Sequence, residues 1–153
     1  MPTDTLRSTT VLLVGTADWV GAVADALTDT GASVRTAETA EAALERFQEG
    51  SIDCILTGYE LTEATGLEVV RSVRQETETV PVLLCTASGS EAIASDAIAA
   101  GVSDYIVIDE QGDSADDILG RIERSIRTAR EDRTRQDRAR QFDAMFRDTR
   151  TAV

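Results

Sequence analysis

Short apolar runs alternate with amphipathic segments along most of this 153-residue chain, and that alternation constrains its fold most strongly. Helical spacing of the apolar residues predicts five helices, the first over Asp18–Thr30 and the last running on from Ser114. Continuous apolar strands separated by helices indicate a parallel sheet covered on both faces. Right-handed crossovers then favour an α/β three-layer sandwich with strand order 2-1-3-4-5. The five predicted strands are Thr10–Val14, Ser33–Thr36, Asp53–Thr57, Val82–Cys85 and Tyr105–Ile108.

Turn and capping residues mark the ends of several predicted elements. Thr39 is the expected N-cap of the second helix, and Ser90 or Glu91 begins the fourth. Gly101 follows the fourth helix, where a glycine commonly ends one. The segment from Gly58 to Thr65 has no clear period, and we expect an irregular loop there.

The distribution of charged and apolar residues divides the chain into three parts. We expect residues 1–9 to be disordered or loosely ordered, 10–127 to form the α/β domain, and 128–153 to be a charged helical extension or linker. Apolar residues return at helical spacing in this last part, at Phe142, Met145 and Phe146. They suggest a following domain or a dimer contact, with packing on the core as the alternative.

Two residue types are missing, and their absence excludes many functions. The chain has no His and no Lys, so all 15 basic residues are Arg. A histidine general base, a histidine metal ligand, a phosphotransfer histidine and a lysine Schiff base are therefore impossible. The two cysteines, Cys54 and Cys85, lie in predicted strands, where we expect buried free thiols.

The chain is strongly acidic, with a net charge of -13. Residues 128–153 hold seven Arg against five Asp or Glu, which leaves -15 on the rest. Such a surface repels nucleic-acid phosphates and anionic lipids, so we expect neither partner. An acidic chain without lysine also resembles proteins of salt-loving microbes. No apolar run approaches the ~20 residues of a membrane helix and no signal peptide is evident, so we expect a cytoplasmic protein.

Ligands of such a sheet bind where its strands end, beside the switch between the first and third strands. The residues at this edge are mostly small or apolar. No pair of carboxylates, no base and no dinucleotide-binding glycine motif is among them, so the sequence predicts no cofactor and no catalytic residue. They lie in Val14–Thr16, Thr57–Tyr59, Cys85–Ala87 and Val107–Asp109.

Several short segments follow one another along the chain: Val11–Val14, Gly66–Val70, Pro81–Val82, Thr86–Ala87 and Asp104–Tyr105. Together, in their order and spacing, they resemble the response-regulator receiver (CheY-like) family of two-component signalling. The resemblance covers about residues 10–127 and implies a flavodoxin-like (βα)5 fold and a role in phosphorelay signal transduction.

The resemblance also implies a site that this sequence has largely lost. In the family, an acidic pair and an aspartate hold magnesium, and the aspartate accepts a phosphoryl group that a hydroxyl and a lysine contact. Here the positions of the acidic pair hold Gly15 and Thr16. The acceptor position holds Gly58, and the lysine position holds Ile108. Only the hydroxyl, Thr86, matches.

A few other residues bear on this site. Tyr105 matches the aromatic residue that the family uses as a rotating switch, although a tyrosine on an edge strand needs no special role. Asp18 and Glu60 lie near the edge and offer at most a weak cation site. Asp53 begins its strand, so it lies roughly 16 Å from the edge. We expect Trp19 to pack the first helix against the core.

Two hypotheses of function follow. The first is a receiver domain that accepts no phosphoryl group and acts as a protein-interaction or regulatory module, in the N-terminal part of a multidomain sensor of the PAS or histidine-kinase type. Its partners would be other proteins or flanking domains, or a second copy through the C-terminal helix. The alternative is a sensor that binds a phosphate or nucleotide ligand in a neutral crevice beside Gly15 and Gly58. An enzyme is not expected.

Overall fold

The main sheet has the predicted strand order. A computed structural model describes residues 6–16, 18–62, 64–108 and 115–132 of the chain. Five parallel strands are arranged in the order β2-β1-β3-β6-β7, which is the predicted 2-1-3-4-5 of the main strands. The α/β fold expected from the alternation is therefore confirmed. The strands are β1 (Thr10–Val14), β2 (Ser33–Ala37), β3 (Cys54–Gly58), β6 (Val82–Thr86) and β7 (Asp104–Val107).

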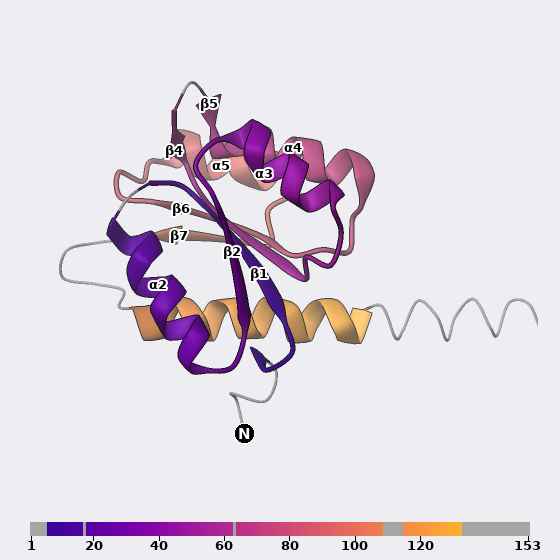
Figure 1. Ribbon diagram of the computed structural model, residues 1–153. Coiled ribbons are helices and arrows are strands. Elements are labelled where there is room, and N and C mark those ends of the chain that lie inside the picture. The colour runs from indigo at the N-terminus through magenta and orange to yellow at the C-terminus, as the bar shows by residue number, and fades with distance from the viewer. Residues whose placement is uncertain (1–5, 17, 63, 109–114, 133–153) are drawn as a thin grey trace, which may run out of the picture.

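Helices cover both faces of this sheet (Figure 1). The helix over residues 115–132 packs with α2 on one face, and the remaining helices lie on the other. Its predicted apolar stripe is buried, with Ile118 1% exposed and Ile122 fully buried. The other helices are α2 (Asp18–Asp29), α3 (Ala40–Gln48), α4 (Gly66–Glu76) and α5 (Glu91–Ala100).

The predicted helix caps are present. The Ala42 N–H donates to the Thr39 side chain at 3.1 Å, and the Ile93 N–H donates to the Ser90 side chain at the same distance. Each bond satisfies a backbone donor that the first turn of a helix leaves unpaired. Gly101 ends α5 with a φ of 99°, in the left-handed region that glycine adopts at little cost.

The segment after β3 differs from the expected irregular loop. It forms a short antiparallel hairpin of β4 (Glu60–Leu61) and β5 (Ala64–Thr65), in which Glu60 pairs with Thr65. The hairpin turns the chain back, so that the Gly66 N–H donates to the Tyr59 carbonyl at 2.8 Å. Strands of two residues are too short to show a period in the sequence, which is why the prediction missed them.

The packed structure begins before residue 10. Leu6 is 2% exposed and belongs to the core under α2 and the helix over residues 115–132. Thr9 is fully buried, and Arg130 donates to its hydroxyl at 3.4 Å. Leu6 and Thr9 therefore pack with the domain ahead of the expected boundary at residue 10. The expected apolar group at residues 142–146 lies outside the described residues.

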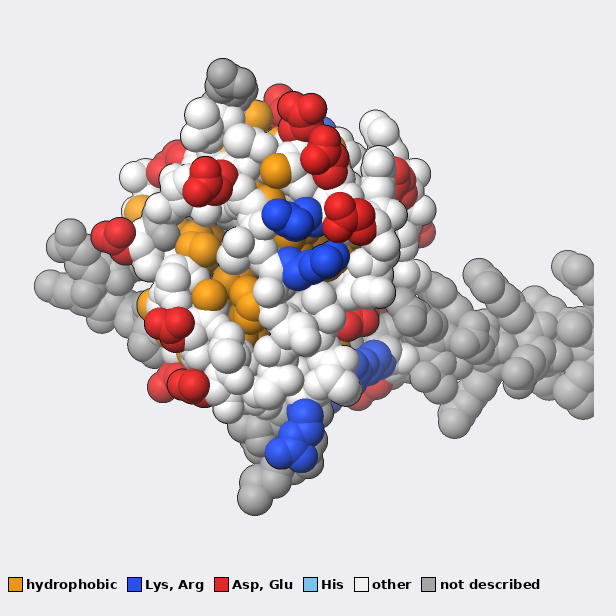
Figure 2. Space-filling view, in the orientation of Figure 1, with side chains coloured by type: hydrophobic (Ala, Val, Ile, Leu, Met, Phe, Trp, Pro, Cys, Tyr) orange, Lys and Arg blue, Asp and Glu red, His pale blue; other side chains and the backbone are white. Residues whose placement is uncertain are grey.

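Charge on the surface follows the acidic composition. On the face seen in Figure 2, acidic side chains are spread around the periphery and a few basic ones gather near the centre. Apolar side chains are visible between them. Within the part of the chain that the structure describes, no helix is long and apolar enough to cross a membrane.

Candidate functional site

The carboxyl ends of four strands bring the predicted site residues to one edge of the sheet. Gly58 ends β3 and lies opposite Cys85 of β6. The Ile108 N–H donates to the Thr86 carbonyl at 2.8 Å, which places Ile108 beside the end of β6. Gly15 follows β1, and its N–H donates to the Ala37 carbonyl at 2.9 Å. The strand ends thus meet as the topology requires.

The indole of Trp19 lies close to the position that a Cβ atom on residue 58 would take. A Cβ atom built on Gly58 would be 3.3 Å from Trp19 Cζ2, and one built on Gly15 would be 3.9 Å from the same atom. Trp19 is half-buried and packs against the core under α2, as the sequence predicted. Its approach to Gly58 was not predicted, because only the fold brings α2 over the end of β3.

This set of residues does not fit a magnesium ion. The family's ion needs carboxylate oxygens at positions that here hold Gly15 and Thr16, and Gly58 supplies no side-chain oxygen either. Asp18 begins α2 and Glu60 lies on the hairpin. Among the described residues, no three His, Cys, Asp or Glu side chains are grouped so that they could hold a metal. We therefore derive no chemistry that passes through a metal here.

Thr86 keeps its place at the edge, and its hydroxyl is already engaged. The side chain is 2% exposed, and its Oγ1 donates to Glu60 Oε1 at 3.2 Å. The same oxygen accepts the Ser88 N–H at 3.2 Å. A carboxylate from the hairpin thus lies against the one hydroxyl that matches the family, a contact the sequence did not predict.

Tyr105 lies on β7 with its ring half-buried beside Leu67, Leu84 and Ala97. Its hydroxyl oxygen is buried and has no hydrogen-bond partner among the residues that the structure describes. Gly89, in the loop between β6 and α5, lies directly against it, because a Cβ atom built there would be 2.9 Å from the Tyr105 oxygen. The ring is thus held by packing rather than by a hydrogen bond from its hydroxyl.

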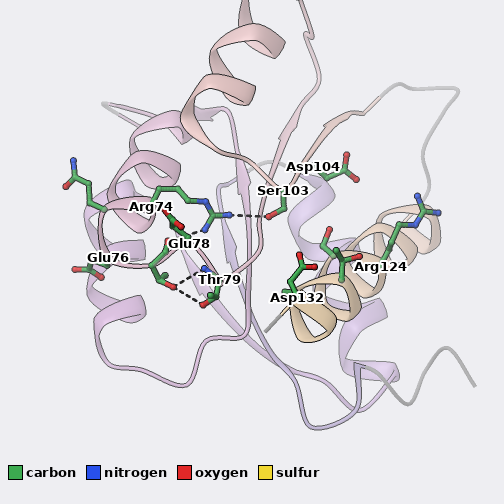
Figure 3. Close-up of a pocket in the computed structure, with 13 residues that line it drawn as sticks. Arg74, Glu76, Glu78, Thr79, Ser103, Asp104, Arg124 and Asp132 are labelled. Carbon is green, nitrogen blue, oxygen red and sulfur yellow. Dashed lines mark hydrogen bonds between the residues drawn. The ribbon is translucent and has the colours of Figure 1, made fainter. Parts of the chain in front are cut away.

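A groove of about 930 Å³ lies at the opposite edge of the domain, where α4 ends and β7 begins (Figure 3). The helix over residues 115–132 forms its far side. Most of the side chains that line it are polar, and Glu76, Glu78, Asp104 and Asp132 give it four carboxylates. The sequence did not predict this groove, which exists only because the last helix packs beside the start of β7.

Arg74 organises one wall of that groove. Its guanidinium donates to the carbonyls of Gly101 at 2.8 Å and Val80 at 2.7 Å, and to the hydroxyl of Ser103 at 3.2 Å. Burial lowers the pKa of Arg74, an effect that the nearby Glu78 carboxylate opposes. Because its donors are used within the domain, this guanidinium holds two loops together and is poorly placed to receive a ligand.

Known proteins resemble this chain in sequence. Residues 16–113 match the response regulator receiver domain. The chemotaxis protein CheY of Bacillus subtilis is 30% identical over 80 residues, which are 52% of this chain and 67% of CheY. The phosphate regulon transcriptional regulatory protein PhoB of Rhizobium meliloti is 31% identical over 87 residues, 56% of this chain but only 37% of PhoB.

Solved structures agree with this assignment. A CheY-like receiver domain protein from Methanospirillum hungatei superimposes with a TM-score of 0.74 at 18% identity, over 81% of this chain and 98% of that one. The chemotaxis protein CheY4 of Vibrio cholerae gives a TM-score of 0.69 at 25% identity, over 76% of this chain and 98% of its own. Because the family match over residues 16–113 covers more than half of the chain, this chain belongs to the response regulator receiver domain family.

Proposed function

We propose that this receiver domain accepts no phosphoryl group and acts as a protein-interaction and regulatory module in two-component signalling. The observation that carries the proposal is the position of Trp19, whose ring lies against the place that an acceptor side chain would take on Gly58. An acceptor needs a carboxylate and open space for the incoming group. Gly58 offers no carboxylate, and the indole occupies part of the space.

The neighbouring positions support the same proposal. Gly15 and Thr16 cannot supply the carboxylates that hold a divalent cation, and Ile108 cannot supply a positive charge to a phosphoryl group. Because several positions of the site lack the side chains that phosphoryl transfer needs, a single isolated change at residue 58 does not explain the sequence. We also propose that the domain has no enzymatic activity, since the chain has no His or Lys, and among the described residues the Glu60 carboxylate is the only ionisable side chain with a hydrogen bond to the Thr86 hydroxyl.

The proposed interaction surface is formed by α5, β7 and the helix over residues 115–132. Two large apolar side chains are exposed there: Ile98 on α5 is 72% exposed, and Val107 on β7 is 42% exposed. Among the described residues, no other large hydrophobic side chain is exposed. Exposed apolar side chains of this size are typical of surfaces that another protein covers.

We extend the proposal to residues 128–153, which would lead into a following domain or pair with a second copy. The described part supports a helical connection, because the last helix continues through residue 132. Analytical ultracentrifugation of residues 1–153 and of residues 1–132 tests the pairing. A dimer for the longer chain and a monomer for the shorter one are expected, and a monomer in both cases contradicts it.

The ligand-sensor alternative receives no support from the site. It needs a neutral crevice between Gly15 and Gly58, and the Trp19 ring borders both positions. The large groove lies at the other edge of the sheet, where its four carboxylates outnumber the guanidinium groups of Arg74 and Arg124, and this balance disfavours a phosphate-bearing ligand.

Incubation with acetyl phosphate and magnesium chloride, followed by intact-mass measurement, tests the main proposal. We expect no mass gain of one phosphoryl group, while Bacillus subtilis CheY under the same conditions serves as the positive control. A phosphoryl group on any aspartate of this chain would overturn the proposal.

A further inference from the structure

A continuous series of contacts leads from Glu60, on the β4–β5 hairpin, to Tyr105 on β7. It passes through Thr86 at the end of β6 and through the loop that joins β6 to α5. The first and last contacts join segments that are far apart in the sequence, the middle one lies within a single loop, and none involves an external ligand. The series therefore connects the former phosphoryl site with the proposed interaction surface by means of the chain's own side chains.

The first contact satisfies a buried hydroxyl. Thr86 is 2% exposed, and its one hydroxyl proton goes to Glu60 Oε1 at 3.2 Å. Glu60 itself is exposed, so its carboxylate reaches inward from the hairpin while it remains solvated. Hydrogen bonds to a carboxylate are stronger than those between neutral groups, so this bond fixes the orientation of the hydroxyl.

The second contact fixes the loop. Thr86 Oγ1 also accepts the Ser88 N–H at 3.2 Å, and a hydroxyl that donates to a carboxylate is a better acceptor. Two residues further on, Ser90 caps α5 by accepting the Ile93 N–H at 3.1 Å. The backbone between Thr86 and α5 is therefore bonded at both ends, with Gly89 between them.

The third contact holds the aromatic ring. A Cβ atom built on Gly89 would be 2.9 Å from the Tyr105 oxygen and 2.6 Å from Val107 Cγ2, so the loop lies directly over both side chains. The Tyr105 hydroxyl is buried without a hydrogen-bond partner among the described residues. A phenol in that state gains by turning outward to water, so the inward ring requires the loop to stay closed over it.

We propose that Glu60 is a positioning residue that keeps Tyr105 in its buried conformation through Thr86 and the loop at residues 87–90. Its carboxylate supplies, from within the chain, the anion that the Thr86 hydroxyl would otherwise receive from a phosphoryl group. The domain thus holds one fixed form of its α5–β7 surface without a chemical signal. This inference rests on the proposed function, because an external phosphoryl group would compete for the same hydroxyl.

Fluorine NMR of protein labelled with 3-fluorotyrosine tests the inference. The chain has two tyrosines, Tyr59 and Tyr105, so two resonances are expected and Tyr59→Phe assigns them. Glu60→Ala and Thr86→Val remove the bond, and each should shift or broaden the Tyr105 resonance. Hydrogen exchange at Ser88 should quicken at least tenfold in the same variants.

Conservative changes at the same positions separate positioning from a general structural role. Thr86→Ser keeps the hydroxyl and should retain the wild-type Tyr105 resonance, whereas Glu60→Gln keeps an acceptor oxygen without the charge and should shift that resonance less than Glu60→Ala does. Glu45→Ala, an exposed acid on α3, controls for the change in net charge. If Thr86→Val fails to fold, Glu60→Ala still decides the question, because Glu60 is exposed.

An unchanged Tyr105 resonance and unchanged Ser88 exchange in Glu60→Ala would overturn the inference. That result is distinguishable from a failure of the proposed function, which appears only as phosphorylation of the wild-type chain by acetyl phosphate. If the wild-type chain is not phosphorylated and Glu60→Ala changes neither readout, only the positioning role of Glu60 is rejected and the proposed function stands.

Discussion

The Cζ2 atom of Trp19 lies 3.3 Å from the position that a Cβ atom on Gly58 would take. This distance is shorter than an ordinary carbon–carbon contact, so a side chain at residue 58 requires the indole to shift by a few tenths of an ångström. The backbone at Gly58 does not have a positive φ, and a larger residue is therefore opposed by the ring rather than by backbone strain.

Replacing Gly58 with aspartate should therefore not restore phosphorylation. We expect Gly58→Asp to lower the free energy of unfolding by about 1–3 kcal/mol, because it forces a side chain against a packed ring. Urea denaturation measures this loss, and acetyl phosphate with intact-mass measurement should detect no phosphoryl group.

A double-mutant cycle identifies Trp19 as the cause of that loss. In the Trp19→Ala background, Gly58→Asp should cost less than in the wild type, with a coupling free energy of about 1 kcal/mol or more. Additive effects of the two changes would show that the ring is not what residue 58 meets.

Gly66 should tolerate no side chain. A Cβ atom there would overlap the Gly58 carbonyl oxygen and lie 2.7 Å from Leu84 Cδ1, since α4 begins directly against the end of β3. We expect Gly66→Ala to lower the free energy of unfolding by about 3 kcal/mol, as measured by urea denaturation.

Gly21→Ala is the matched control. It lies in α2 with nothing within 4 Å of its Cβ position, and should gain ~0.5–1 kcal/mol from helix propensity. Equal effects at both sites would contradict the packing described here.

Arg74 should contribute more to stability than other arginines on the same helix. Arg74→Met keeps much of the aliphatic volume but removes the bonds to Gly101, Val80 and Ser103. Because the carbonyls would lose a charged donor, we expect the free energy of unfolding to fall by about 2–3 kcal/mol. Hydrogen exchange near the start of β7 should become faster. Arg71→Met, at an exposed position of α4, should change stability by less than ~0.5 kcal/mol. A loss as large for Arg71→Met would show that the bonds of Arg74 are not the cause.

Stability should fall at alkaline pH because of Cys54. Burial raises the pKa of its thiol, and the nearby Asp53 carboxylate raises it further. The folded chain thus keeps a proton that the unfolded chain loses above about pH 8.5. The resulting stabilisation is fully present below that pH and declines above it, by up to ~1.4 kcal/mol per pH unit.

Urea denaturation between pH 7 and 10 measures this decline in the wild type and in Cys54→Ala. The variant should be less stable at neutral pH, because it loses buried volume, but its stability should decline less steeply with pH. Parallel curves would mean that the Cys54 thiol ionises equally in both states.

The sequence predicted those parts of the structure that depend on local pattern. The strand order follows from five apolar runs, and the caps at Thr39 and Ser90 follow from a hydroxyl placed before a helix. Asp53 also lies where it was placed, at the amino end of its strand, where it accepts the Thr10 N–H at 2.8 Å.

The parts that the sequence did not predict depend on contacts between distant residues. Trp19 was correctly assigned to the core, but its distance from Gly58 depends on how α2 crosses the sheet. The bond from Thr86 to Glu60 spans 26 residues and requires the hairpin, which has no periodic signal. The bonds of Arg74 span up to 29 residues. The one sign of the Trp19 contact in the sequence was Gly58 itself, because a glycine at a position where a side chain is expected can leave room for a neighbouring side chain.

The burial of Leu6 has a mechanical consequence for the whole domain. Leu6 shares its cluster with Ile118, Ile122 and Ile126, and Arg130 reaches the hydroxyl of Thr9 from the same helix. A rotation or shift of that helix would have to draw Leu6 out of the core. Leu6 and Thr9 therefore resist movement of the helix over residues 115–132 relative to the sheet, so that this helix and the segment before β1 would have to shift together.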